Sequence, residues 1–262
     1  MNESHYDRVG DLVTAIMNGL GNPDVVSIDD LAPVDEFHLG GAAATTEVIR
    51  ALEVGPSDRV LDVGCGLGGP ARRIATVTGA HVTGVDVTSA FVATAAHLSG
   101  RVGLREKTTF HVGDVAALEF SRSFDAATLV HVGMNIADKS GFFATIHDLL
   151  VPGGRFVIYD LMAIGPVDDL AYPLPFAADA SGAFLASPDE YRAALYAAGF
   201  VTSEPTDLTQ LSLDAAAATR VAGAPSVSLA TVMGPDFGTM FRNLGAALQE
   251  EILAPTLLVA TS

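Results

Sequence analysis

A glycine-rich segment that directly follows a short apolar run constrains this chain of 262 residues more than any other feature. The run RVLDVG at 59–64 has the length and composition of a buried strand. GCGLGG at 64–69 overlaps its end, and PARRIATVTG then carries apolar residues at helical spacing, with Gly79 as a stop. Glycines let a backbone turn sharply and approach a ligand closely, and the start of the next helix adds unpaired N–H groups. The segment therefore predicts a strand, a ligand-binding turn and a helix.

The same alternation of strand and helix patterns continues to residue 160. We expect further strands at 81–87, 108–115, 123–133 and 155–162, and helices at 88–100 and 139–150. Pro152, Gly153 and Gly154 should separate the last of these helices from the strand that follows it. Strands that alternate with helices favour a mostly parallel sheet with helices on both faces, so the predicted fold class is α/β and Rossmann-like.

The regions that flank this pattern differ from it. Residues 1–54 predict a helical N-terminal cap, and residues 163–186, with prolines and aromatic residues, predict an irregular loop. A capping-box sequence from Ser187 to Glu190 should begin another helix. A helix near 241–252 and a last strand near 254–261 complete the pattern. The expected organisation is a cap or lid at 1–54 and one domain at 55–262, with substrate-side insertions near 163–186 and 211–250.

The glycine pattern by itself fits two kinds of nucleoside ligand. Gly64, Gly66 and Gly69 satisfy the GxGxxG spacing of nicotinamide-dependent dehydrogenases. Asp86, at the end of the second strand, could accept hydrogen bonds from ribose hydroxyls in either case. Asp62 lies inside an apolar strand, where a carboxylate needs partners such as turn N–H groups or a ligand ammonium. A pyrophosphate site would gain nothing from that charge, so Asp62 favours a different nucleoside.

Four segments follow one another in a distinctive order: VLDVGCGLGGPARRIA at 60–75, GVDVT at 84–88, FHVGDV at 110–115 and LLVPGGRFVIYD at 149–160. In this combination the chain resembles the class I S-adenosylmethionine-dependent methyltransferases. It is similar to their small-molecule branch, which includes quinone, tocopherol, sterol and glycine methyltransferases. The resemblance implies S-adenosyl-L-methionine as methyl donor and S-adenosyl-L-homocysteine as product. It also implies a seven-stranded, mostly parallel sheet whose last strand is antiparallel.

The resemblance further implies which residues bind the cofactor. The turn around its methionine part would consist of Asp62, Gly64, Cys65, Gly66 and Gly68, with the Cys65 side chain serving in packing. Asp86 would bind the ribose. The adenine would be contacted by Val87, Gly113, Asp114 and Val115. His131 would lie beside the methionine moiety and the transferring methyl group.

Two histidines in loop contexts are the catalytic candidates. His38 lies in DEFHLGGAAAT at 35–45, and His131 begins HVGMNIADK at the carboxyl end of a predicted strand, where ligands bind in open α/β sheets. Both segments look like a bacterial subgroup of these methyltransferases with a similar pairing. Methyl transfer is an in-line displacement that requires alignment of the reacting atoms. A hydroxyl or carbon acid would need a base, whereas a neutral amine or a thiolate would not.

The substrate pocket is expected between the N-terminal segment, the 163–186 loop and the 231–241 segment. Its predicted residues are mostly aromatic or apolar: Phe37, Met134, Asn135, Tyr159, Tyr172, Phe176, Met233 and Phe237. Basic residues are few in the chain, so a neutral or apolar acceptor is favoured over a phosphorylated one. The acceptor atom stays open between oxygen, nitrogen and carbon.

Charge and cysteine content exclude several other functions. The net charge is −17 with only 14 Lys and Arg residues, so nucleic acid and anionic membrane surfaces are unlikely partners. A single cysteine rules out an intrachain disulfide framework, no apolar run approaches the roughly 18 residues of a membrane span, and no secretory signal is visible. We expect a cytoplasmic monomer or homodimer without a required metal.

Two alternatives to methyl transfer remain at this stage. A methyltransferase-fold protein could bind the cofactor without transferring the methyl group, for example as a cyclase or a regulatory protein, because a fold does not determine a function. An NAD(P)-dependent oxidoreductase is the other alternative. Asp62 and the PGG sequence before the fifth strand argue against it.

Overall fold

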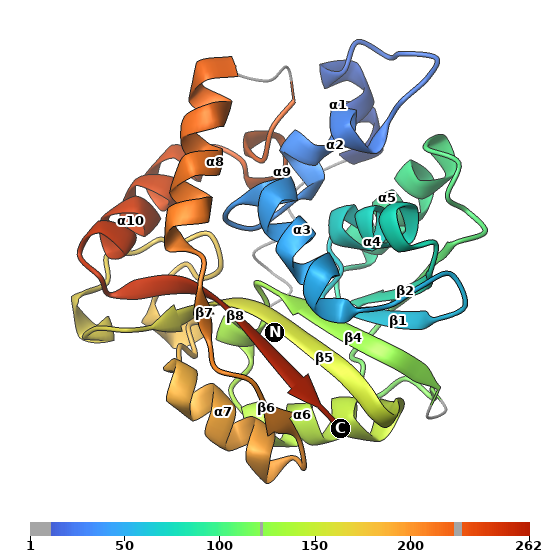
Figure 1. The fold of residues 1–262 in the computed structure, drawn as a ribbon. Helices are drawn as coiled ribbons and strands as arrows, with labels where there is room; N and C mark the ends of the chain where they lie inside the picture. The colour runs from blue at the N-terminus through green and yellow to red at the C-terminus, as the bar shows by residue number, and fades with distance from the viewer. Residues whose placement is uncertain (1–11, 121–122, 223–226) are drawn as a thin grey trace.

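The computed structural model describes residues 12–120, 123–222 and 227–262, and its centre is an eight-stranded sheet (Figure 1). The strands are β1 (Arg59–Val63), β2 (His81–Asp86), β3 (Thr108–Val112), β4 (Phe124–Val130), β5 (Leu150–Ala163), β6 (Val201–Thr202), β7 (Thr206–Asp207) and β8 (Leu253–Thr261). Their order is β3-β2-β1-β4-β5-β8-β6, and β7 also pairs with β8. The first five are parallel, and β8 is antiparallel to β5, which confirms the predicted fold class.

The outer edge of the sheet is the one departure from the expected seven strands. Both β6 and β7 pair with β8, so together they form a single outer strand with a gap. The gap contains Ser203, whose Oγ accepts a hydrogen bond from the backbone N–H of Val259 at 3.2 Å, and Pro205, which has no N–H to donate. The ladder is therefore interrupted where a side chain and a proline replace its regular bonds.

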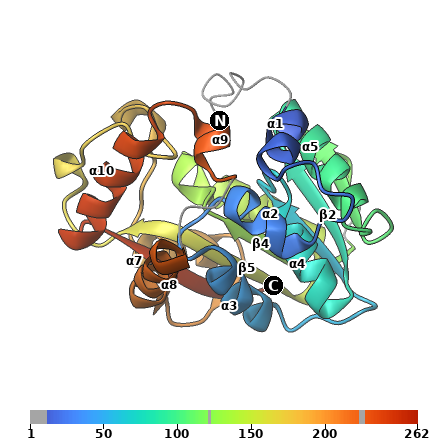
Figure 2. The ribbon, with the colours of Figure 1, turned by 90° about the horizontal axis from the view of Figure 1, so that it is seen from above.

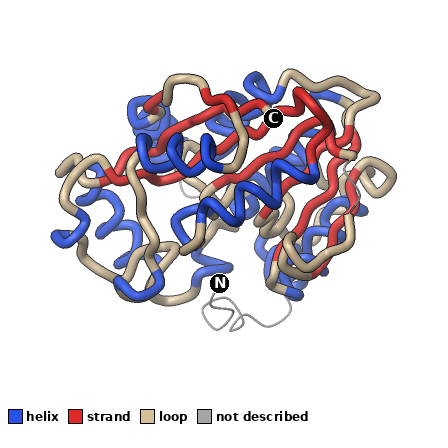
Figure 3. Tube along the Cα trace, turned by 90° about the horizontal axis from the view of Figure 1, so that it is seen from below, coloured by secondary structure: helices blue, strands red, loops and turns tan. Residues whose placement is uncertain are grey.

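Helices cover both faces of the sheet. They are α1 (Leu12–Gly19), α2 (Ile28–Asp35), α3 (Gly41–Leu52), α4 (Gly69–Thr78), α5 (Ser89–Arg101), α6 (Lys139–Leu149), α7 (Pro188–Ala197), α8 (Thr209–Ala222), α9 (Ala230–Met233) and α10 (Phe237–Gln249). The buried residues of α3 and α4 pack on one face with Val82 and Val157. Those of α6 and α7 pack on the other with Leu129 and Phe156. The view from below shows helices crossing in front of the strands on this second face (Figure 3).

Two strand boundaries differ from the sequence prediction, for identifiable reasons. The strand β5 begins at Leu150, and Pro152 to Gly154 form an irregularity in its pairing with β4 instead of a separate break. The strand β4 ends at Val130 instead of residue 133, because His131 has φ of 53° and leaves the extended conformation. The helix predicted from Ser187 is confirmed, with both hydrogen bonds of the capping box present.

The layer above the carboxyl ends of the strands is assembled from three distant parts of the chain. Buried residues of α1 and α2 pack with Val227 and Val232, the latter from α9. Leu170 and Leu174 pack with Leu244 of α10. Figure 2, seen from above, shows α9 between α10 and the pair α1 and α2. The N-terminal helices therefore pack with the start of the 227–249 region, and the 163–186 region packs with α10; we call this layer the cap.

Among the described residues, no helix combines the length and the apolar character that crossing a membrane requires.

Candidate active site

The glycine turn after β1 packs directly against the loop after β4. Gly64 has φ of 72°, and its N–H donates a 2.8 Å hydrogen bond to Val85 O of the neighbouring strand. A Cβ at this position would overlap the side chain of Val132. Glycine is therefore required here both for the left-handed conformation and for the close approach of the two loops. The turn is thereby held beside His131, the residue that precedes Val132.

Asp62 places a buried carboxylate beneath this turn. Its side chain is 1% exposed, and Oδ1 accepts a 2.8 Å hydrogen bond from Thr128 Oγ1 on β4. Oδ2 is buried and has no hydrogen-bond partner among the described residues. Burial raises the pKa of Asp62 to about 6, against the effect of the Thr128 hydrogen bond. A buried carboxylate oxygen without a partner is costly, so this geometry suits a ligand that brings a donor.

Asp86 lies at the end of the adjacent strand and is held by the turn itself. Its Oδ2 accepts a 2.9 Å bond from the Gly66 N–H, and its Oδ1 accepts a 2.8 Å bond from the Thr88 N–H. Burial raises its pKa, and these two backbone bonds oppose that shift. A Cβ added to Gly66 would meet no atom within 4 Å, so the space beside Asp86 is open at that point.

The remaining residues expected near a nucleoside follow β2 and β3. The Gly113 N–H donates a 2.9 Å bond to Asp86 O, which ties the end of β3 to the end of β2. Asp114 is exposed, with Oδ1 accepting from the Ala116 N–H at 3.0 Å, whereas Val115 is buried and Val87 is half-buried. These side chains thus lie at the same edge of the sheet as Asp86.

Cys65 is buried in the turn, as the packing interpretation predicted. Burial raises the pKa of its thiol well above the ordinary value, and the nearby Asp62 adds to that shift. The thiolate required of a nucleophile is therefore disfavoured at this position.

His131 adopts a conformation that few non-glycine residues adopt, with φ of 53°. Its N–H donates a 2.8 Å bond to Tyr159 O, and its ring lies 5.1 Å from the Tyr159 ring between centroids. Its Nε2 is buried and has no partner among the described residues. Burial lowers the pKa of His131 well below the usual value, and the neighbouring His38 lowers it further. His131 is therefore a neutral imidazole with a free polar atom.

His38 faces His131 from the cap, with the two ring centroids 5.8 Å apart. In contrast to His131, its Nε2 has several neighbours: Gly41 O at 3.1 Å, Thr45 Oγ1 at 3.0 Å and Glu36 Oε2 at 3.6 Å. Burial lowers the pKa of His38, and the negative charge of Glu36 opposes that shift. The two histidines, 93 positions apart in the sequence, thus meet at one place with different surroundings.

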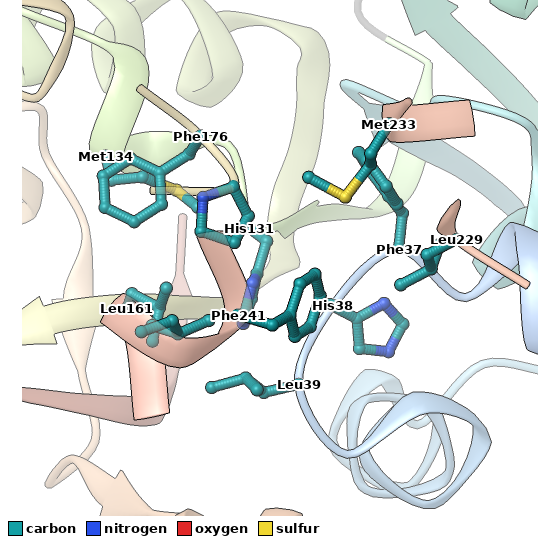
Figure 4. Close-up of a pocket in the computed structure, with 12 residues that line it drawn as sticks. Phe37, His38, Leu39, His131, Met134, Leu161, Phe176, Leu229, Met233 and Phe241 are labelled. Atoms are coloured by element: carbon teal, nitrogen blue, oxygen red, sulfur yellow. The ribbon is translucent and has the colours of Figure 1, made fainter. Parts of the chain in front are cut away.

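Both histidines line an otherwise apolar cavity between the cap and the sheet (Figure 4). Its other lining residues are Phe37, Leu39, Met134, Leu161, Pro175, Phe176, Leu229, Met233, Phe241 and Leu244. Figure 4 shows the two imidazole rings among aromatic, aliphatic and methionine side chains. No charged side chain belongs to this lining.

The cavity contains half of the pocket residues expected from the sequence: Phe37, Met134, Phe176 and Met233. The other four lie outside its lining. Asn135 braces the cap through a 2.8 Å bond from Nδ2 to Phe176 O, and Tyr159 is fully buried with its hydroxyl donating to Leu39 O at 3.0 Å. Tyr172 packs against the buried cluster that includes Leu170 and Leu174, and Phe237 packs on Phe241 with ring centroids 4.5 Å apart.

Sequence reasoning did not assign six lining residues: Leu39, Leu161, Pro175, Leu229, Phe241 and Leu244. A signal was present for two of them, because Phe241 and Leu244 lie at helical spacing on α10 and so share a face. That pattern predicts a buried face and does not say whether it meets core or cavity.

Two adjacent arginines of α4 attach the cap to the glycine turn. Arg72 is fully buried, and its Nη2 donates at 2.6 Å to Asp35 Oδ2 and at 2.6 Å to Leu67 O in the turn. Arg73 Nε donates at 2.7 Å to Glu36 Oε1. The segment that carries His38 is therefore held against the same turn that packs on Val132. Both sides of the cavity therefore contact the glycine turn, which lies between Asp62 and Asp86.

Comparison with known proteins agrees with this arrangement. The "Methyltransferase domain" family matches residues 61–158. Methyltransferase GfsG of Streptomyces halstedii is 30% identical over 213 residues, which cover 79% of this chain and 74% of that protein. Sterol 24-C-methyltransferase ERG6A of Gibberella zeae is 36% identical over 131 residues, 49% of this chain and 34% of that protein, so the chain spans about a third of that relative.

Solved structures share the fold at low identity. A geranyl diphosphate C-methyltransferase from Streptomyces coelicolor A3(2), in complex with Mg²⁺, geranyl-S-thiolodiphosphate and S-adenosyl-L-homocysteine, has a TM-score of 0.69 at 17% identity, covering 98% of this chain and 95% of that one. The 4+2 cyclase SpnF has a TM-score of 0.67 at 22% identity, covering 96% and 93%. At such identities the likeness supports the fold alone.

The strand order, the helices on both faces and the antiparallel β8 define a Rossmann-like α/β fold of the methyltransferase type. With the relative that is 30% identical over most of both chains, this chain belongs to the class I S-adenosylmethionine-dependent methyltransferases. Its cofactor is S-adenosyl-L-methionine. The match favours methyl transfer over the oxidoreductase and over a protein that only binds the cofactor.

Proposed function

We propose that the protein transfers the methyl group to a neutral, largely apolar small molecule bound in the cavity between cap and sheet. The observation that carries this proposal is the cavity lining, in which ten of twelve side chains are apolar and the other two are histidines. A phosphorylated acceptor would need cations, and a cationic acceptor would be stabilised by carboxylates. The lining offers neither Lys or Arg nor Asp or Glu.

The contrast with one structural neighbour supports this choice. The geranyl diphosphate C-methyltransferase was solved with Mg²⁺ and a thiolodiphosphate analogue. Mg²⁺ that binds a phosphate-containing substrate is usually held by one or two carboxylates together with phosphate oxygens and water. The cavity lining of this chain has neither carboxylates nor basic side chains, which supports a different acceptor chemistry here.

Two observations on the donor side support binding of S-adenosyl-L-methionine there. When bound, the cofactor supplies a methyl group activated on a sulfonium. We assign the unpartnered Asp62 Oδ2 to its ammonium group, because that oxygen is buried and needs a donor. Asp86, whose two oxygens are aligned by backbone N–H groups, would accept the ribose hydroxyls. The backbone of Gly64, Cys65, Gly66 and Gly68 would surround the methionine part.

We assign the adenine to the segment after β3 and the methyl group to the histidine side of the cavity. Val87, Gly113, Asp114 and Val115 lie at the edge next to Asp86, with Asp114 exposed and able to accept from the exocyclic amine. His131 follows β4, and Val132 beside it packs on Gly64. The methyl group would therefore enter the cavity near His131. Of the chain as a whole, we propose a cytoplasmic monomer or homodimer in which the N-terminal segment, described from residue 12 to residue 54, caps the domain at 55–262; the expected cap at 1–54 also includes residues 1–11, which lie outside the described residues.

A transfer assay with methyl-tritiated S-adenosyl-L-methionine tests the proposal. We expect label in neutral apolar molecules such as long-chain alcohols, phenols, arylamines and alkenes, and none in phosphorylated or quaternary ammonium acceptors of the same skeletons. Thermal unfolding in a hundredfold excess of S-adenosyl-L-homocysteine over its Kd should show about 2.7 kcal/mol of stabilisation. Label that enters phosphorylated acceptors in preference would refute the proposed acceptor class.

A further inference from the structure

The hydrogen bonds around His38 determine which of its nitrogens is free. Gly41 O lies 3.1 Å from Nε2, and a carbonyl can only accept, so Nε2 carries the proton of the neutral ring. The Thr45 hydroxyl donates to Glu36 Oε2 at 2.6 Å, which leaves its oxygen free to accept from the same Nε2–H at 3.0 Å. The lone pair of neutral His38 is therefore on Nδ1, which makes Nδ1 the atom that can take a proton.

Glu36 stands behind this ring on the side away from Nδ1. Its Oε2 is 3.6 Å from Nε2, and its side chain is 2% exposed. The carboxylate is held from two sides, by Arg73 Nε on Oε1 at 2.7 Å and by Thr45 Oγ1 on Oε2. When a proton adds to Nδ1, the ring becomes a cation next to a buried carboxylate, and that contact stabilises it. This is the arrangement of a base oriented by a carboxylate.

His131 lacks this support. Its Nε2 has no partner among the described residues, and the group that most affects its charge besides burial is His38, which would repel a second cation. The Tyr159 ring, 5.1 Å away, offers no negative charge. Only one of the two histidines is thus built to become charged. The other is a neutral hydrogen-bonding group at the wall of the cavity.

A base backed by a carboxylate is useful only when the acceptor must lose a proton to react. A neutral amine attacks through its own lone pair, and an alkene attacks through its π electrons, so neither requires a base before the methyl group moves. An alcohol or phenol is a poor nucleophile until its proton leaves. Among neutral apolar acceptors, a hydroxyl compound is the kind that needs both a base and a neutral hydrogen-bonding group, which the two histidines provide.

We infer that the acceptor atom is the oxygen of a hydroxyl group on an apolar molecule, that His38 Nδ1 is the general base, and that Glu36 is its positioning residue. The inference rests on the proposed function. In the step, the hydroxyl oxygen forms a bond to the methyl carbon, and the methyl–sulfur bond breaks with its electron pair staying on sulfur. The hydroxyl proton passes to Nδ1 and later to water. His131 Nε2 orients the hydroxyl group.

The charged groups around His38 allow variants with opposite expected signs. Glu36 favours the protonated ring, and Arg73 disfavours it. His131 is neutral, and the Tyr159 ring packs edge-on at 5.8 Å. The neutral ring is the active form, so activity falls as pH drops through the pKa of His38. Glu36→Gln should lower that pKa and move the acid limb of the pH profile to lower pH. Arg73→Met should raise it and move the limb to higher pH.

The experiment uses matched pairs of acceptors that are both neutral near pH 7, naphthol with naphthylamine and p-octylphenol with p-octylaniline, and methyl-tritiated S-adenosyl-L-methionine. We expect label in the hydroxyl member of a pair, a loss of about 100-fold or more in kcat for His38→Ala, and unchanged donor Kd by calorimetry. The pH profiles of Glu36→Gln and Arg73→Met should shift in opposite directions. A merely structural role of Glu36 would shift neither profile.

The possible outcomes separate the inference from the proposed function. Preference for the amine members, or acid limbs that move together or not at all, overturns the role of His38 while leaving the acceptor class intact. An absence of label in all neutral apolar acceptors, with donor binding retained, overturns both.

Circular dichroism and thermal unfolding of each variant establish that it is folded. Thr45→Val is a second variant that tests the surroundings of the His38 ring. It removes the hydroxyl that links Glu36 to Nε2 and should weaken catalysis without changing donor Kd.

Discussion

The donor side and the acceptor side of this site are built in different ways. The proposed donor side is made by one strand, one turn and the end of the next strand, with its carboxylates at Asp62 and Asp86, and the proposed acceptor side is the cavity. The acceptor side draws its lining from distant stretches, from Phe37 in the cap to Leu244 on α10. A cofactor shared by a large family can be held by a local, recurring unit. An acceptor that differs from member to member is held by parts whose meeting depends on the whole fold.

The two sides also differ in charge, yet each presents one unsatisfied polar atom. Asp62 Oδ2 on the donor side and His131 Nε2 on the acceptor side are both buried without a partner among the described residues. The donor side contains carboxylates, and the cavity contains no charged side chain. Orphaned buried polar atoms are rare in native structures. The described residues contain two others, Nε of Arg72 and Nε of Arg155, and we assign only Asp62 Oδ2 and His131 Nε2 to the bound ligands. The following variants test whether the sides are as separable as this comparison implies.

The largest effect is expected at the junction of the two sides. In Gly64→Ala the new Cβ would overlap Val132 in a backbone with φ of 72°, so overpacking adds to conformational strain. We expect a loss of about 3–5 kcal/mol in the free energy of unfolding, measured by urea denaturation. Gly21→Ala is the control, since Gly21 has φ of 78° with no atom within 4 Å of the added Cβ, and should lose only about 1–2 kcal/mol. Equal losses would show that the contact with Val132 is not important.

A pH dependence without cofactor should come next in size. The folded pKa of Asp62 is raised to about 6 from 3.8, so the folded state retains a proton that the unfolded chain has lost between these values. Stability should therefore fall as pH rises from about 4 to 6, by about 2–3 kcal/mol, and then stay level with respect to this group. Asp62→Asn should lack this component, and the difference between the two unfolding curves isolates it from Asp35 and Asp160. Parallel curves would contradict the buried, unpaired carboxylate.

Asp62→Asn should also weaken donor binding. The amide keeps an oxygen that can accept from Thr128 but replaces the charged Oδ2, which we assign to the cofactor ammonium. In calorimetry, we expect the binding free energy of S-adenosyl-L-homocysteine to weaken by about 1.5–3 kcal/mol, so that its Kd rises roughly 10- to 150-fold. The relative rates with different acceptors should be the same as in the wild-type protein. A variant with wild-type affinity would place the ammonium elsewhere.

The smallest effect on donor binding is expected from a substitution in the cavity, on the proposed acceptor side. Met233→Ala enlarges the cavity at a half-buried position of the cap. We expect bulkier acceptors to be accepted and KM values to change, while donor Kd stays within about 0.3 kcal/mol because the variant is remote from the turn. Competition assays with acceptors of graded size provide the measurement. A donor Kd that changes together with acceptor selection would mean that the two sides are energetically coupled.

Much of the donor side could be anticipated because its signals are local. Asp62 stood out as a carboxylate in an apolar strand, and the structure finds it buried with one free oxygen. The gap between β6 and β7 and the end of β4 at Val130 could not be anticipated. They depend on a side-chain bond to Val259 and on the backbone of His131, neither of which leaves a periodic pattern.

The acceptor side was anticipated only in part, for the same reason. Phe37 and Met233 line the cavity as expected. Tyr159 is instead fully buried outside the lining, and Asn135 donates a hydrogen bond to Phe176 O. Apolar composition predicts burial and does not distinguish a cavity wall from a core. Glu36 lies two positions before His38 in the same segment, 35–45, but the sequence does not show that its carboxylate is near the His38 ring. Its proximity to Nε2 depends on the turn at Gly40 and Gly41 that brings Thr45 to both.

The sequence by itself determined the alternation of strands and helices, the glycine turn and the class of cofactor, because hydrophobic period and turn chemistry act over a few neighbouring residues. Tertiary structure alone decided which of the histidines lies beside a carboxylate and which side chains line the cavity. Those relations join residues from the cap, the carboxyl ends of β4 and β5, and α10. They are set by packing and burial between distant segments, which no local pattern records.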